Sequence, residues 1–178
     1  MHLAAGITVG ITAGITMYPD PGKAVCFTWA CALGSILPDI DSPSSMISKC
    51  IPILPTLVCK IFGHRGLFHA PIVPLLAYGM TKIFESMMSE ITYVALSGIF
   101  IGYVLHLLQD SFTIGGVPIF YPFSSYKLNF SCARSGSFWN YPTTCFLVVL
   151  CIVCCIYGVN TPKILFQAIG NFLGTFQT

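Results

Sequence analysis

The side chains of this chain that could do chemistry lie in short polar islands, although most of the sequence is apolar. All four histidines and three of the six acidic residues belong to these islands. Imidazole and carboxylate groups are costly to place among apolar segments unless they bind one another or an ion. They are also the ligands that zinc, manganese and iron use in proteins. The pattern therefore predicts a metal site, whose candidate ligands are His2, Asp39, Asp41, His64, His69, His106 and Asp110.

The strongest pair within this set is His106 and Asp110, which lie four residues apart. Residues at i and i+4 share one helix face, so both side chains can reach one ion. The alternative is a histidine that is hydrogen-bonded across a helix bundle and an aspartate that caps a turn. Asp39 and Asp41 are two carboxylates that repel each other unless a cation or a proton lies between them. Their alternative is an Asx turn after a helix that stops at Pro38.

A further island, His64-Arg65-Gly66-Leu67-Phe68-His69, places an arginine between two histidines. The two rings would diverge on a regular helix, so we expect a bend at Gly66 that brings both inward. Arg65 suits an anionic group such as phosphate, because a guanidinium binds two oxygens at once. The alternative is an arginine whose charged end reaches back to the membrane surface.

The chemistry that such a set predicts is metal-assisted hydrolysis. A bound ion lowers the pKa of a water ligand, and Arg65 or a second ion holds the anionic oxygens of the substrate. Asp39 or Asp41 is the candidate general base. Seven donors are enough for one or two divalent ions, and the mixture of nitrogen and oxygen favours zinc, with manganese or iron as alternatives.

The elements that must position these residues are apolar enough for a membrane. The chain is 55% hydrophobic and 8% charged, with a mean hydropathy of +0.81. These values predict an all-α fold, a polytopic α-helical membrane protein with a single membrane-embedded domain over residues 1–178. The net charge of +2 comes without a long basic run, so we expect no nucleic-acid partner.

We expect about five transmembrane helices and one re-entrant or interfacial segment. That segment is residues 46–62, which two prolines interrupt. A final amphipathic or short spanning helix is expected at residues 163–176. If residues 46–62 do not cross, alternation of antiparallel helices places all candidate ligands on one side of the membrane, and the excess of basic loop residues on that side predicts the cytoplasm. The expected spans are Leu3–Tyr18, Lys23–Leu37, His69–Ile83, Ile91–Leu108 and Phe138–Tyr157.

Three glycines, Gly6, Gly10 and Gly14, recur at four-residue spacing in the first expected span. Small residues at this spacing lie on one helix face and allow a second helix to approach closely. The stripe therefore predicts close helix packing, and a homo-oligomer through these glycines is one form that such packing could take.

Four motifs in order resemble the YdjM-like family, whose members are bacterial inner-membrane proteins described as predicted membrane-bound, metal-dependent hydrolases. The motifs are Leu-Pro-Asp-Ile-Asp-Ser-Pro-Ser (37–44), His-Arg-Gly-x-x-His (64–69), Gly-x-x-x-His-x-x-x-Asp-x-x-Thr-x-x-Gly (102–116) and Pro-Ile-Phe-Tyr-Pro-Phe-Ser (118–124).

The resemblance covers residues 1–125. It implies that the seven candidate ligands form the metal site, with Arg65 and Thr113 close to it as substrate-binding residues, in the bacterial inner membrane. The chain departs from the family's histidine box at Phe68 and Ala70, where two hydroxyl residues are usual. Because a lost hydroxyl weakens the orientation of neighbouring ligands, this departure bears on how the site handles its substrate.

Together the residues and the resemblance predict a membrane-bound hydrolase that cleaves an ester or phosphoester bond by metal-activated water. A lipid or other membrane-associated substrate is expected, because the site opens at the level of the headgroups. One alternative is a divalent metal-ion transporter, since transporters also use intramembrane His and Asp. Another is a non-catalytic membrane assembly protein, in which the polar islands cap helices.

Overall fold

The computed structural model describes residues 1–42, 45, 66–124 and 126–130, and within them the chain is mostly helical. The helices are α1 (His2–Met17), α2 (Pro21–Gly34), α5 (Ile72–Ile83) and α6 (Glu90–Ser111), and the short 3-10 turns are η1 (Leu37–Asp41), η2 (Leu67–His69) and η3 (Glu85–Met87). The helical class expected from the composition is therefore confirmed for this part of the chain.

A small antiparallel hairpin that the sequence did not indicate follows α6. Its strands are β1 (Val117–Pro118) and β2 (Lys127–Leu128). Gly116, directly before β1, has a φ of 58°, a left-handed conformation that side chains with a Cβ rarely adopt. The segment after Thr113 is thus partly ordered by strand pairing between residues about ten apart.

Local capping and proline decide where the helices begin. The side chain of Asp20 accepts hydrogen bonds from the backbone N–H groups of Gly22 and Lys23, so α2 begins at Pro21 and not at Lys23 as expected. In the third expected span, Ala70 is extended, at a φ of −90° and a ψ of 136°. Helix α5 therefore begins only after Pro71, and His69 lies in the preceding η2 turn.

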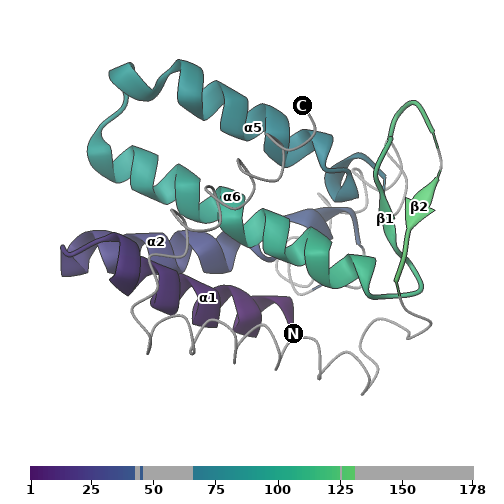
Figure 1. Ribbon diagram of the computed structural model, residues 1–178, viewed down its shortest axis with the longest axis horizontal. Helices are drawn as coiled ribbons and strands as arrows, with labels where there is room; N and C mark the ends of the chain where they lie inside the picture. Colours follow the sequence, from purple (N-terminus) through teal and green to yellow (C-terminus); the bar gives the residue numbers. More distant parts are fainter. Residues whose placement is uncertain (43–44, 46–65, 125, 131–178) are drawn as a thin grey trace, which may run out of the picture.

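Helix α6 is the central element and packs against α2, α1 and α5 (Figure 1). The successive pairs α1–α2 and α5–α6 are antiparallel, so the start of α1, the end of α2, the start of α5 and the end of α6 lie at one end of the bundle (Figure 1). This end carries the described residues of the polar islands. The hairpin lies beyond it, next to the end of α6.

The glycine stripe of α1 packs against α2 of the same chain. A Cβ added at Gly10 would lie 2.9 Å from the Cα of Thr28, and one at Gly14 would lie 2.9 Å from the backbone oxygen of Ala24. All three glycines of the stripe are buried. Close helix packing is as predicted, but the face is occupied within the chain, so the stripe gives no support to a homo-oligomer.

Two of the described helices meet the length and hydropathy of a membrane span. They are α2 together with η1, over Pro21–Asp41, and α6, over Glu90–Ser111, whereas α1 and α5 are shorter apolar helices. The outward faces of the short helices carry large apolar side chains, including Ile15 and Ile83, which are 68% and 70% exposed. The expected number of five spans is not confirmed, and the segments 46–62, 138–157 and 163–176 lie outside the described residues.

Candidate metal centre

Five of the expected ligands meet at one end of the bundle, although they come from four separate elements. His2 begins α1, the η1 turn carries Asp39, the η2 turn carries His69, and the last turns of α6 carry His106 and Asp110. This is the common end that alternation of antiparallel helices predicts. Two of the other expected site residues, His64 and Arg65, lie outside the described residues.

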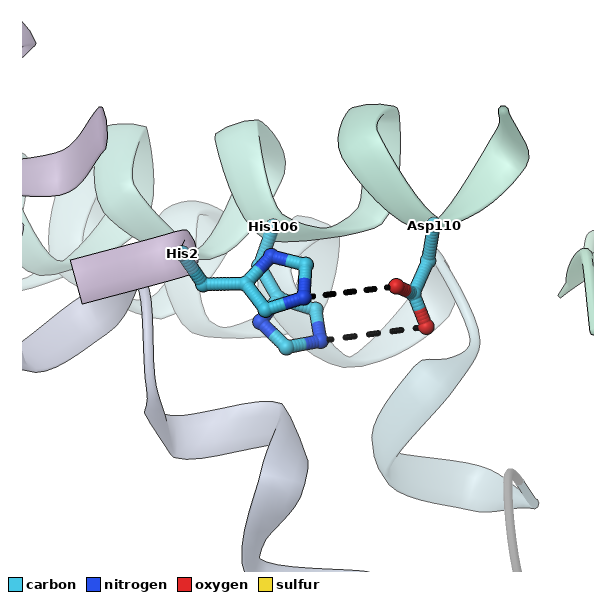
Figure 2. Close-up of side chains that lie close together, drawn as sticks. All are labelled: His2, His106 and Asp110. Carbon is cyan, nitrogen blue, oxygen red and sulfur yellow. Dashed lines mark ion pairs between the residues drawn. The ribbon is translucent and has the colours of Figure 1, made fainter. Parts of the chain in front are cut away.

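The carboxylate of Asp110 is at the centre of the cluster. Its Oδ1 lies 3.5 Å from Nε2 of His2, and its Oδ2 lies 3.5 Å from Nε2 of His69 and 4.0 Å from Nε2 of His106. Figure 2 shows the rings of His2 and His106 one over the other, each with a nitrogen directed at Asp110. Their centroids are 4.0 Å apart. On the other side, Nε2 of His106 lies 3.9 Å from Oδ1 of Asp39.

These separations are close to those that a bound ion requires. Two ligand atoms at about 2.0 Å from a tetrahedral zinc ion are about 3.3 Å apart, only slightly less than the distances around Asp110. Among the described residues, two groups of three donors have all their ligand atoms within 4.8 Å of one another, and His106 belongs to both. The groups are His2 with His106 and Asp110, and Asp39 with His69 and His106. The donors are therefore already gathered at near-ligand spacing.

The second nitrogen of each of the three described histidines lies against an oxygen that can only accept a hydrogen bond. Nδ1 of His2 lies 2.9 Å from Oε1 of Gln109, Nδ1 of His69 lies 2.9 Å from Oδ2 of Asp41, and Nδ1 of His106 lies 2.8 Å from the backbone oxygen of Ser35.

Each Nδ1 must consequently carry the proton and donate it, which leaves the lone pair on Nε2. All three lone pairs then face the carboxylates. This is the arrangement of histidines that ligate metals, in which a partner on the far nitrogen sets the tautomer and orients the ring.

Burial divides the cluster into a closed side and an open side. The side chains of His69, His106, Asp41 and Asp110 are at most 2% exposed, whereas those of His2 and Asp39 are 20% and 32% exposed. His2 precedes the first expected span, and burial, together with the nearby His106, lowers the pKa of its imidazole to about 4. The ring is neutral at neutral pH, which is the form that binds a metal. Within the described residues, the cluster is therefore most exposed on the side of His2 and Asp39.

Asp41 and Thr113 were expected as a metal ligand and a substrate-binding residue, but each contacts another part of the site. Asp41 lies behind His69 as its hydrogen-bond acceptor and belongs to neither group of gathered donors. Thr113 is 3% exposed, and its hydroxyl donates to the backbone oxygen of Asp110 at 2.9 Å. This bond closes the end of α6, so Thr113 supports the position of Asp110 through the backbone.

The sequence left open that His106 is a histidine hydrogen-bonded across the helix bundle. One of its two ring nitrogens, Nδ1, does make such a bond. Its Nδ1 joins α6 to the end of α2 through Ser35, while its Nε2 faces the two carboxylates. Sequence reasoning missed both this carbonyl and Gln109. A backbone carbonyl cannot be recognised from residue types. Gln109, in contrast, could have been noticed, because it is a polar residue next to Asp110 and near His106 in an apolar segment.

Comparison with known proteins gives one family and several relatives. The family model described as YdjM inner membrane protein matches residues 1–166. The uncharacterized protein YvsG of Bacillus subtilis is 29% identical over 125 residues, which cover 68% of this chain and 71% of that protein. The inner membrane protein YdjM of Escherichia coli is 36% identical over 92 residues, which cover 51% of this chain and 46% of that protein. The match therefore spans less than half of that YdjM protein. No solved structure matches the chain.

Proposed function

We propose that this chain, which belongs to the YdjM inner membrane protein family, is a membrane-bound, metal-dependent hydrolase. The proposed reaction is hydrolysis of an ester or phosphoester bond in a lipid or other membrane-associated substrate. The names of the relatives describe inner membrane proteins and state no activity, so the proposal rests on the site. The observation that carries it is the convergence of three histidine Nε2 atoms on Asp110, each with its Nδ1 bound to an oxygen.

The donor chemistry suits a transition-metal ion. His2, His69, His106 and Asp110 would hold it, and Asp39 would complete the set or serve a second ion. A set rich in imidazole favours zinc, with manganese and iron as alternatives. When bound, such an ion supplies Lewis acidity and lowers the pKa of a water ligand.

The two remaining carboxylates have different roles in the proposal. Asp39 is one-third exposed at the open side, where it can take a proton from an approaching water. Asp41 is fully buried and orients His69. Of the two candidate general bases, Asp39 is therefore the one that we propose. We retain Arg65 as the residue that binds the anionic group of the substrate.

The position of the site supports a lipid substrate. Its ligands lie at the end of α6, which is long and apolar enough to span a membrane. The end of a span lies at the level of the lipid headgroups, where ester and phosphoester bonds are found. We propose a multi-pass arrangement of about five spans, with the metal centre at the cytoplasmic face.

The test is metal content followed by a substrate screen. The full chain, purified in mild detergent and incubated with zinc, should bind one or two ions, and the variants His106→Ala and His69→Gln should bind fewer. Ser111→Ala is the matched control, because the hydrogen bond of the Ser111 hydroxyl within the described part of the chain goes to the Leu108 carbonyl of its own helix. It should bind metal as the original chain does.

The zinc-loaded protein should then hydrolyse at least one member of a panel of phospholipids, lysophospholipids and lipid phosphates. Loss of that activity in the histidine variants, but not in Ser111→Ala, would support the assignment. Failure on the whole panel by fully metal-loaded protein would contradict the hydrolase proposal. Zinc uptake into proteoliposomes would point instead to the transporter, and a chain without bound metal would leave only the assembly protein.

A further inference from the structure

His2 is the proposed ligand whose position depends most on side chains far away in sequence. It is the first residue of α1, and the residue before it provides no side-chain cap. Its ring stacks on His106 and is held through its nitrogens by Gln109 and Asp110, which are 107 and 108 positions further along the chain. The orientation of the ring is therefore decided by α6.

Gln109 and Asp110 are consecutive residues that bind opposite nitrogens of the same imidazole. Oε1 of Gln109 lies 2.9 Å from Nδ1, and Oδ1 of Asp110 lies 3.5 Å from Nε2. Gln109 is 6% exposed, so water does not readily replace its amide. With the amide oxygen as acceptor, the proton stays on Nδ1 and the lone pair of Nε2 faces Asp110.

Without this acceptor the same site would select the wrong tautomer. The carboxylate of Asp110 can only accept, so in a metal-free site it favours a proton on Nε2, the atom that must carry the lone pair. His69 avoids this outcome through the carboxylate of Asp41, and His106 avoids it through a backbone carbonyl. For His2, the group that opposes Asp110 is the side chain of Gln109.

We propose that Gln109 is a positioning residue that holds His2 in the Nδ1-protonated tautomer, with Nε2 directed at the metal. The proposal rests on the proposed function, because it assigns His2 to the metal centre of that hydrolase. It adds a residue to which neither the motifs nor the relatives assign a role. In this assignment, His-x-x-Gln-Asp at the end of α6 holds two ligands and the group that orients a third.

Two substitutions separate the hydrogen-bond acceptor from the volume of the side chain. Gln109→Met has a similar length and no amide, whereas Gln109→Glu keeps an oxygen at the end of the side chain. Partners that orient metal-bound histidines typically change metal affinity by about 10- to 100-fold when they are removed. We therefore expect zinc to bind Gln109→Met about 10- to 100-fold more weakly, and Gln109→Glu at least as tightly as the original chain.

Two spectroscopic readouts report on the ligand geometry rather than on stability. The visible spectrum of the cobalt-loaded protein should change in Gln109→Met and be retained in Gln109→Glu and in the Ser111→Ala control. In metal-free protein with ¹⁵N-labelled histidine, the His2 resonances should report the Nδ1-protonated tautomer in the original chain and in Gln109→Glu. They should report the Nε2-protonated tautomer in Gln109→Met.

The experiment distinguishes the failure of this inference from the failure of the proposed function. If the tautomer of His2 is the same in all three proteins, or if Gln109→Met binds zinc as tightly as the original chain, the positioning role is overturned. An equally weak Gln109→Glu would also overturn it. If the original chain binds no metal, the proposed function fails, and the tautomer measurement still decides what Gln109 does to His2.

Discussion

Gly102→Ala should weaken the proposed metal centre although Gly102 is not one of its ligands, because Gly102 lies where α6 touches α2. A Cβ at this position would meet the carbonyl oxygen of Cys31 and lie 2.8 Å from the backbone nitrogen of Ser35. Both are backbone atoms and cannot rotate away. Ordinary van der Waals contact begins at 3.4 Å, so the helices must separate by at least about 0.6 Å at Ser35 and by more at Cys31.

This separation acts on the residue that holds His106. Ser35 supplies the backbone oxygen that accepts the hydrogen bond of His106 Nδ1 at 2.8 Å. A shift of about 0.6 Å would stretch this bond to about 3.4 Å, beyond the usual range of about 2.7–3.2 Å. Overpacking of this kind destabilises a protein by about 1–3 kcal/mol. We therefore expect lower thermal stability and weaker zinc binding from a single added methyl group.

Gly79→Ala is the matched control, since it adds the same methyl group to another helix. Among the residues that the structure describes, nothing lies within 4 Å of a Cβ at Gly79. Alanine favours a helix over glycine by about 1 kcal/mol, so this variant should be as stable as the original chain or slightly more stable. Thermal unfolding in detergent and zinc titration of the three proteins make the comparison. A Gly102→Ala protein with unchanged unfolding temperature and zinc affinity would refute the close contact of α2 and α6 and the reasoning built on it.

Three further outcomes follow from the same contacts. Asp41→Ala should weaken zinc binding about 10- to 100-fold while Asp41→Asn weakens it less, because an amide oxygen still accepts from His69 Nδ1; equal losses in a zinc titration would contradict an acceptor role. Tyr103→Phe removes the hydroxyl that donates to the Phe68 carbonyl beside His69, so it should lower the free energy of unfolding by about 1 kcal/mol; an unchanged unfolding curve would show that this bond contributes nothing. Removal of metal by a chelator should lower the unfolding temperature of the original chain, because an ion bound at the proposed centre would stabilise the folded state. A variant without His106 should respond less, and a chain whose unfolding temperature ignores the chelator would speak against a bound ion.

Much of the helical framework could be predicted from hydropathy and local signals. The expected spans at Leu3–Tyr18 and Ile91–Leu108 correspond to α1 and α6 within a few residues, because long apolar segments between turn residues have few other structures open to them. The predicted ends of the helices were less accurate where local features, such as a side-chain cap or a proline, decide them. The cap by Asp20 moved the start of α2, and the extended Ala70 before Pro71 left His69 in a turn.

The hairpin after α6 shows a different limit. Its strands are two residues each, and they pair across a connection that contains Pro122 and the exposed aromatic residues Phe120, Phe123 and Tyr126. Such short strands have no alternating pattern to detect, so pairing at this length depends on the surrounding structure.

Residue types and spacing alone determined which side chains could bind a metal ion. They also determined that these side chains lie at one end of the helix bundle. His106 and Asp110 share a face because a helix repeats every 3.6 residues, and alternation of antiparallel helices brings His2 to the same end. Tertiary structure alone decided which atoms meet. It placed Asp41 behind His69, the carbonyl of Ser35 under His106 and the amide of Gln109 on His2, across 28, 71 and 107 residues of sequence. These contacts depend on how closely α1, α2 and α6 approach one another and how each is rotated, and a one-dimensional pattern does not contain either quantity.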